Sequence, residues 1–499
     1  MTADSDWLSF RDAPKIRTPP PGPHSRRLLE AQEKYETEAV TYSKHFPLAI
    51  SDARGATVED ADGNRFIDWV GGVCVLNLGH RHPRLEAALA RQAAKVWHAL
   101  ELPTEARVQF LETLSGLLPG RLKHHARTIF TVTGGDAVET AVNIAEHVTG
   151  RRGVVAFSGA YHGVHGGAAN LTSGRRFHQT TAFHGGTVVR VPFPDPYRPV
   201  LGADHGAAGT LSYLEHLVND PYSGVDELAA VVVEPILGEG GYIVPPDDFL
   251  PGLREFCDRH DLLLIVDEIQ SGLGRTGAMW AVDHAGVTPD LLCIAKTIGG
   301  GLPLSMVAYR DDLPKKLPPG FHLGTYRGNP LALAVGTEVL KVLHEQEWAH
   351  KTARRGALLK ERFQEIASEL PGIGQVRGKG FMIGLEFVKD PTHKAAWGEG
   401  AKQMRRAMFA RGVLMHTCGP HDQVLRFMAP LIIEDELLER GLEVFEESLQ
   451  SIEGTPAPVK APHLAGSTAP GPPELGPPAH LPAPSHHPPA PPPPGRNLD

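Results

Sequence analysis

The stretch LLCIAKTIGGGLPLSMV (residues 291–307) decides the fold, because a lysine stands where an apolar run ends. Lys296 follows a run typical of a buried β-strand and precedes three consecutive glycines. A lysine in such a place is expensive to keep charged, so burial lowers its pKa toward the neutral amine that attacks an aldehyde. The stretch therefore predicts a buried strand that ends at a reactive lysine.

A second apolar run, LLLIV (262–266), ends at Asp267, which lies 29 residues before Lys296. Enzymes that use pyridoxal phosphate (PLP) pair a Schiff-base lysine with an acid beside the pyridine nitrogen. Taken alone, a lysine at a strand end more commonly extends its charged group into solvent. The pairing with Asp267 favours PLP as the cofactor and makes both residues candidate catalytic groups.

The composition of the 499-residue chain is that of an ordinary enzyme with one large core or two to three smaller ones. The net charge of -9 comes without a long basic block, so we expect no nucleic-acid partner. No run of 18 apolar residues and no apolar leader occurs, and we expect neither a membrane span nor a signal peptide. The four widely spaced cysteines predict reduced thiols in a cytoplasmic protein. The histidine pairs lack the cysteine or acid spacing of a metal site, so no metal is expected.

The order of the elements predicts an α/β fold with a largely parallel sheet, because short β-branched runs alternate with segments of helical periodicity. Seven strands are expected, at residues 128–132, 154–157, 187–191, 229–233, 262–267, 291–295 and 305–309. From residue 454 the composition shifts to Pro, Ala, Gly and His. Such a tail (454–499) buries too little apolar area to offset its ordering entropy, and we expect it to be disordered. Docking of an SH3-like partner on this tail is a weaker alternative.

The segments DEIQSGLGRTG (267–277) and IAKTIGGGLPLSMV (294–307) resemble those of the class III aminotransferases, which are PLP enzymes of fold type I. The resemblance runs from about residue 35 to 450 and includes several motifs in the expected order. It implies a large PLP-binding domain at 76–335. It also implies a smaller α+β domain, formed by an N-terminal segment (1–75) and a C-terminal segment (336–453).

The segment TGGDAVETA (133–141) follows a predicted strand and opens a helix, whose first backbone N–H groups can bind phosphate. Gly134 and Gly135 allow the chain to approach the phosphate closely. A plain strand-to-helix turn with capping residues is the alternative. By the resemblance this is the phosphate loop, and it is especially similar to the matching segment of diaminobutyrate–2-oxoglutarate transaminases.

Three further cofactor contacts are implied by the resemblance. Tyr161 in GAYHG (159–163) would stack on the pyridine ring, with His162 in a supporting role. Gln270 would hydrogen-bond the ring hydroxyl. Thr325 in GTYRGNP (324–330) would reach the phosphate of a neighbouring subunit, which implies a homodimer. Without the resemblance these residues would pass as a core aromatic, a strand-end amide and a polar loop.

Arg426 in VLRF (424–427) is flanked by apolar residues, and a guanidinium in such surroundings needs a carboxylate. By the resemblance it receives the substrate carboxylate. Glu234, after the strand 229–233, is the candidate acid that neutralises Arg426 when an amine without a nearby carboxylate enters. A purely structural Arg–Glu pair is the alternative.

The expected reaction moves an amino group from an amine or diamino acid to an oxo acid such as 2-oxoglutarate. Val164 stands where 4-aminobutyrate-type relatives commonly have an arginine, and Arg327 also favours the diaminobutyrate group, so the terminal amine of 2,4-diaminobutyrate is the preferred donor. A PLP-dependent racemase or epimerase of the same fold is one alternative, although Glu239 resembles the transaminase pattern. A non-catalytic scaffold acting through the proline-rich tail is the other.

The hexapeptide GLGRTG (272–277) satisfies the GxGxxG pattern of dinucleotide-binding proteins. That fingerprint must turn directly from a strand into a helix. Here residues 269–271 intervene and the segment after residue 277 lacks helical periodicity. We therefore expect no NAD site.

Overall fold

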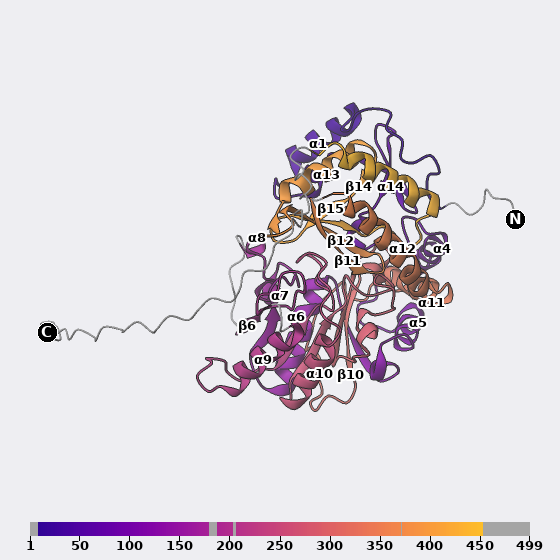
Figure 1. Ribbon diagram of the computed structural model, residues 1–499. Helices are drawn as coiled ribbons and strands as arrows, with labels where there is room; N and C mark the ends of the chain where they lie inside the picture. The colour runs from indigo at the N-terminus through magenta and orange to yellow at the C-terminus, as the bar shows by residue number, and fades with distance from the viewer. Residues whose placement is uncertain (1–7, 179–186, 203–205, 371, 453–499) are drawn as a thin grey trace, which may run out of the picture. The chain divides into compact units, whose positions relative to one another are not determined.

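A seven-stranded sheet carries the site, and all seven strands expected from the apolar runs are present (Figure 1). The computed structural model describes residues 8–178, 187–202, 206–370 and 372–452, and the predicted tail at 454–499 lies outside them. In sheet order the strands are β4 (Ala126–Thr131), β10 (Ser305–Arg310), β9 (Leu291–Ile294), β8 (Leu263–Asp267), β7 (Ala230–Val233), β5 (Val154–Phe157) and β6 (Val188–Val191).

The strand directions confirm a mostly parallel sheet. Strands β9, β8, β7, β5 and β6 pair in parallel, whereas β10 runs antiparallel to both β4 and β9. Alternate residues of β8 enter two different apolar clusters, Leu264 and Val266 in one, Leu263 and Ile265 in the other. Because side chains alternate along a strand, the sheet is buried on both faces, which explains its continuous apolar runs.

Helices cover the two faces of this sheet. Helices α6 (Gly134–Thr149) and α7 (Gly166–Leu171) contribute to one apolar cluster. The opposite cluster includes residues from α5 (Glu105–Ser115), α9 (Gly206–Asn219), α10 (Phe249–Arg259) and α11 (Pro330–Glu345). The predicted domain boundary at residue 336 falls inside α11, which packs against α5 and against α4 (Pro83–Ala93).

The N-terminal and C-terminal segments of the described chain lie together, as the indigo and orange elements show in Figure 1. Strand β3 pairs in parallel with β14, with Ile67 opposite Val413. The N–H groups of Leu8 and Ser9 donate to the Glu434 carboxylate at 2.9 and 3.1 Å. Two smaller sheets occur in this region. One has the strand order β1 (Ile50–Arg54), β2 (Thr57–Asp60), β3 (Arg65–Asp68) and β14 (Val413–Leu414). The other has the order β11 (Ile373–Lys379), β12 (Met382–Asp390), β16 (Val424–Phe427) and β15 (His416–Cys418), with β13 (Ala395–Ala396) paired to β12.

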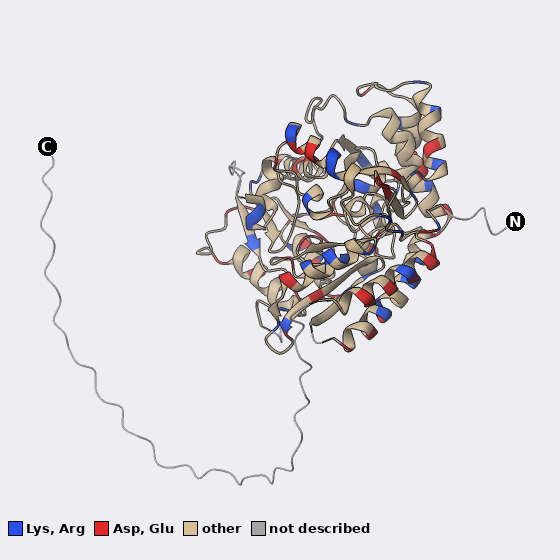
Figure 2. Ribbon diagram, turned by 90° about the horizontal axis from the view of Figure 1, so that it is seen from above, with Lys and Arg blue, Asp and Glu red and all other residues tan. Residues whose placement is uncertain are grey.

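The remaining helices cover these sheets or link the elements. They are α1 (Pro23–Tyr35), α2 (Tyr42–His45), α3 (Gly71–Cys74), α8 (Arg175–His178), α12 (Trp348–Ser368), α13 (Gly398–Ala410) and α14 (Asp435–Leu449), with the 3₁₀ turns η1 (Gly120–Leu122), η2 (Ala281–Ala285) and η3 (Lys296–Gly299). Basic and acidic residues are interspersed over the helices in Figure 2. Among the described residues, none of these helices combines the length and apolar character needed to cross a membrane.

Candidate active site

The predicted residues meet where the parallel strands end. Asp267 is the last residue of β8, and it lies in register with Cys293 of β9, three residues before Lys296. Carboxyl ends of parallel strands share one edge of a sheet, which is where open α/β sheets bind ligands. A cavity of about 650 Å³ lies at this edge. Its lining includes every predicted site residue except Thr325 and Arg426, namely Gly134, Gly135, Tyr161, Glu234, Asp267, Gln270 and Lys296.

Lys296 stands at the start of η3, directly after the buried strand β9. Its φ of 54° lies in the left-handed region, which costs energy for a residue with a side chain. The next residue fixes the turn, because the Thr297 hydroxyl donates to the Cys74 carbonyl at 2.7 Å. Burial lowers the pKa of Lys296, against the opposing effects of Cys74 and Glu239. Burial therefore favours a neutral amine at this position.

Asp267 is held by two donors. His162 Nδ1 lies 2.8 Å from Asp267 Oδ2, and the Ile269 N–H donates to Oδ1 at 3.0 Å. Both side chains are buried, and His162 Nε2 has no partner among the described residues. A neutral histidine can donate through Nδ1 and orient the carboxylate, so the contact gives His162 a supporting position.

A helix N-terminus forms another part of the cavity wall. Thr133 caps α6 by accepting the Asp136 N–H at 3.2 Å, and Asp136 in turn accepts the Val132 N–H at 2.9 Å. Gly163 has a φ of 132°, and a Cβ there would lie only 2.8 Å from the Cα of Gly135. This close packing requires glycine and leaves the helix terminus open to an anion.

The cavity fits PLP on several independent grounds. Besides the lysine, the acid and the phosphate-binding terminus, it contains a buried amide oxygen, Gln270 Oε1, that has no partner among the described residues. A Cβ at Gly238 would lie 2.5 Å from this oxygen, so the glycine makes room for it. A ring hydroxyl donor would satisfy Gln270, as a buried polar atom requires.

Tyr161 and Glu234 are joined at the cavity wall. The Tyr161 N–H donates to Glu234 Oε1 at 2.9 Å, and the Gly238 N–H donates to Oε2 at 2.9 Å. Burial raises the pKa of Glu234 to about 7. The Tyr161 ring meets the edge of Phe177, with centroids 4.9 Å apart.

The expected pairing of Glu234 with Arg426 is wrong. Arg426 Nη1 donates instead to Glu239 Oε1 at 2.6 Å, while both Glu234 oxygens are occupied by backbone N–H groups. Burial favours the neutral form of Glu239, but Arg426 and then Arg176 outweigh it and lower the pKa of this carboxyl. Glu239 lines the cavity, so it is the acid that faces both the arginine and the ligand space.

Arg426 is also bordered by a histidine that the sequence did not indicate. His416, on the neighbouring strand β15, lies opposite Arg426, with Nδ1 at 3.3 Å from Nη2. Burial, and after it the charge of Arg426, lower the pKa of His416 to about 3. The imidazole is therefore neutral beside the guanidinium. Cross-strand register could have revealed this neighbour only after the pairing of β15 with β16 was known.

Thr325 is exposed and lies outside the cavity lining. The loop that carries Thr325 is connected to the N-terminus of α6. Arg327 donates to His322, and His322 Nε2 lies 3.1 Å from Asp136 Oδ1. Because Thr325 does not line the cavity of its own chain, the phosphate contact expected of it would have to be made in a neighbouring subunit.

The glycine-rich hexapeptide 272–277 has a structural role. Strand β8 is followed by turns, and the next helical element, η2, begins at Ala281. Arg275 is fully buried and donates to the Ala429 carbonyl at 2.7 Å and to Asn77 at 2.5 Å. These bonds tie the turn to segments far away in sequence.

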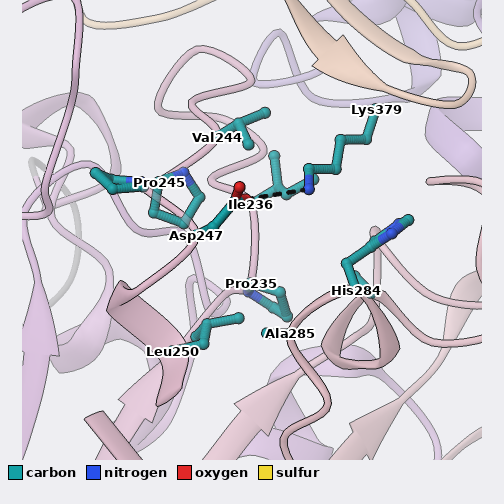
Figure 3. Close-up of a pocket in the computed structure, with 11 residues that line it drawn as sticks. Pro235, Ile236, Val244, Pro245, Asp247, Leu250, His284, Ala285 and Lys379 are labelled. Atoms are coloured by element: carbon teal, nitrogen blue, oxygen red, sulfur yellow. Dashed lines mark ion pairs between the residues drawn. The ribbon is translucent and has the colours of Figure 1, made fainter. Parts of the chain in front are cut away.

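A second, much smaller cavity lies beside the Glu234 segment (Figure 3). It is bordered by Pro235, Ile236 and Leu250 and by an ion pair between Lys379 and Asp247 at 3.6 Å. Its volume of about 30 Å³ has room for little more than one water molecule. It is too small for a cofactor.

The fold and the cavity together define a PLP-dependent enzyme of fold type I. The family model for class III aminotransferases matches residues 39–449, and the chain belongs to this family. It is therefore an aminotransferase and uses PLP.

Curated relatives and solved structures agree with this assignment. The chain is 36% identical to a diaminobutyrate–2-oxoglutarate aminotransferase of Rhizobium meliloti, over 83% of this chain and 90% of that protein. It is 35% identical to the 4-aminobutyrate aminotransferase of Escherichia coli, over 80% and 93%. The ornithine aminotransferase of Toxoplasma gondii superposes with a TM-score of 0.75 at 28% identity, covering 89% of this chain and 96% of that one.

Proposed function

We propose that the enzyme transfers the terminal amino group of a diamino acid, with 2,4-diaminobutyrate preferred, to an oxo acid such as 2-oxoglutarate. The observation that carries this proposal is the Arg426–Glu239 pair beside Lys296. A buried guanidinium at the cavity is suited to a substrate carboxylate, and an acid that can neutralise it suits a donor whose reacting amine lies far from any carboxylate. Similarity to diaminobutyrate–2-oxoglutarate aminotransferases supports this substrate choice.

The residues divide the chemistry among themselves. PLP, when bound, supplies an aldehyde that condenses with amines and a ring that accepts electrons from the adjacent carbon. Lys296 would hold the cofactor covalently and take up the proton from the amine-bearing carbon of the donor, for which its lowered pKa is suited. Asp267, oriented by His162, would accept a hydrogen bond from the ring nitrogen and keep a proton there.

The other cavity residues would hold the cofactor in place. The N–H groups of Gly134 and Gly135 would bind the phosphate, Gln270 the ring hydroxyl, and Tyr161 one ring face. We further propose a homodimer in which Thr325 completes the phosphate site of the neighbouring subunit. The four buried free cysteines are in keeping with a reducing, cytoplasmic location.

The test is an assay of purified, PLP-loaded enzyme with L-2,4-diaminobutyrate and 2-oxoglutarate, in which glutamate is followed by chromatography. Arg426→Ala should raise the KM for 2-oxoglutarate strongly, because loss of a bidentate carboxylate contact costs about 2–4 kcal/mol. Arg406→Ala, which removes an exposed arginine paired with Glu399, should leave the KM unchanged.

The same incubation distinguishes the alternative reaction. Chiral analysis of amino acids incubated without any oxo acid would detect a racemase or epimerase. Inversion at Cα without glutamate formation, across a panel of amines, would refute amino transfer and establish the alternative.

A further inference from the structure

The Glu239 carboxylate lies between two arginines. Its Oε1 accepts from Arg426 Nη1 at 2.6 Å, and its Oε2 accepts from Arg176 Nη2 at 3.2 Å. Arg426 belongs to β16 and is buried, whereas Arg176 belongs to α8 and its side chain is 47% exposed. One acid is therefore shared by a buried and a half-exposed cation.

The backbone of Glu239 is fixed, so only its side chain can move between these partners. The Glu239 carbonyl accepts the Gly419 N–H at 2.9 Å. At the next residue, Gly240, a Cβ would lie 2.5 Å from the Gly159 carbonyl oxygen, which shows how closely this segment packs. Rotation of the side chain remains the available motion.

Arg176 is held in place without Glu239. Its Nη1 donates to Asp422 Oδ1 at 2.9 Å, and its guanidinium lies over the Phe177 ring, 4.8 Å from the centroid. Asp422 is held in turn by Lys402 at 3.3 Å. Arg176 can therefore receive both Glu239 oxygens without first being ordered.

Arg426 is poorly satisfied while Glu239 is shared. Its Nε is buried and has no partner among the described residues. Its Nη2 faces His416 Nδ1, which already donates to the Thr417 carbonyl at 2.6 Å and cannot also accept. Within the described part of the chain, Nη1 is the one nitrogen of Arg426 that contacts a carboxylate. An incoming substrate carboxylate that binds Arg426 bidentately would satisfy more of these donors.

We propose that Arg176 is the second partner of Glu239, a positioning residue that keeps this acid paired when a substrate carboxylate takes Arg426. The inference rests on the proposed function, in which Arg426 alternates between Glu239 and a substrate. Without Arg176, displacement of Glu239 would leave a carboxylate unpaired at the cavity wall, which is costly. Arg176 thus lowers the cost of admitting a carboxylate and sets the affinity for the acceptor.

The direct test measures binding of glutarate, a five-carbon dicarboxylate without an oxo group, to the PLP-loaded enzyme by titration calorimetry. Arg176→Ala should weaken binding by about fivefold, the scale of a half-exposed ion pair. Arg176→Lys, which keeps the charge, should restore most of the affinity. Arg175→Ala removes the exposed neighbouring arginine of α8 and should change the dissociation constant by less than about twofold.

A double-mutant cycle identifies the route of the effect. Glu239→Gln should tighten glutarate binding, because Arg426 loses its competing partner. In that background Arg176→Ala should have no further effect, since Arg176 acts only through Glu239. An equal weakening with and without Glu239 would mean that Arg176 touches the ligand itself and would overturn the proposal. So would identical behaviour of Arg176→Ala and Arg175→Ala.

Kinetics of the separate half-reactions complete the test. Arg176→Ala should raise the KM for 2-oxoglutarate while changing the reaction with a simple terminal amine, followed spectroscopically, by less than about twofold. If the wild type binds glutarate but transfers no amino group, the proposed function fails and the calorimetric cycle still decides the role of Arg176. If the wild type does not bind glutarate, the Arg176 proposal is refuted.

Discussion

At the scale of single residues, Lys296 combines an unfavourable backbone with an unfavourable charge. Its left-handed φ of 54° costs about 1–2 kcal/mol, and burial disfavours the ammonium form. Strained residues of this kind are concentrated at functional sites, where the surrounding structure holds them in place. Here the buried strand β9 and the Thr297–Cys74 hydrogen bond provide that support.

Lys296→Ala should abolish turnover, with a loss of at least about a thousandfold, because the covalent link and the proton carrier disappear together. In the wild type, borohydride treatment should fix the cofactor on Lys296, which peptide mass spectrometry can locate. Lys402→Ala, which removes a lysine paired with Asp422 outside the cavity, should retain the label at Lys296. A label on any other lysine would contradict the assignment.

At the scale of elements, the end of β8 places two consecutive acids in different surroundings. Asp267 faces the cavity, whereas Glu268 points into the packing beneath η2, accepting from the Ser271 hydroxyl at 2.6 Å and the Val282 N–H at 2.8 Å. Burial raises the pKa of Glu268 to about 7. The protonated form is therefore the one that the folded structure prefers.

This preference predicts a pH effect on stability. Because the folded pKa is raised, the stabilisation by Glu268 is complete below about pH 4.5 and is lost as the pH rises through about 7. Glu268→Gln should remove that loss. The free energy of unfolding of the variant, relative to that of the wild type, should therefore rise by up to about 3 kcal/mol between pH 4.5 and 8. Urea titrations of both proteins across this range measure the difference. A constant difference would show that Glu268 keeps an ordinary pKa.

The strands were predictable from the sequence because the sheet is buried on both faces, which forces continuous apolar runs such as 262–266. The closeness of Asp267 and Lys296 follows from the same runs, because both residues stand at the carboxyl ends of neighbouring parallel strands. The partner of Arg426 was not predictable, because Glu234 and Glu239 are both close to the end of β7 and only the folded chain shows that Arg426 donates to Glu239. Arg176 gave no signal, since its contacts with distant acids exist only in the folded chain.

At the scale of the whole molecule, exposed apolar side chains lie around the Thr325 loop. Trp97 is 64% exposed, Leu323 77% and Tyr326 72%. The segment at residues 97–98 contacts the Thr325 loop. The Asn329 amide donates to the Trp97 carbonyl at 2.9 Å, and the ring centroids of His98 and Tyr326 are 5.8 Å apart. Exposed large apolar groups gathered in this way are typical of a protein interface. They support the proposed dimer, in which Thr325 serves the neighbouring site.

Leu323→Asp should shift the protein from dimer toward monomer, because it places a charge on a surface that the dimer would bury. The monomer should lose PLP more readily and turn over more slowly, since each phosphate site would lack the Thr325 of the neighbouring subunit. Light scattering during assay, with cofactor retention measured after gel filtration, tests both effects. Leu358→Asp is the matched control, because Leu358 is 63% exposed on α12 and belongs to a different element. A monomeric Leu323→Asp variant with full activity and normal PLP retention would show that one chain alone completes the site and that Thr325 serves no neighbour.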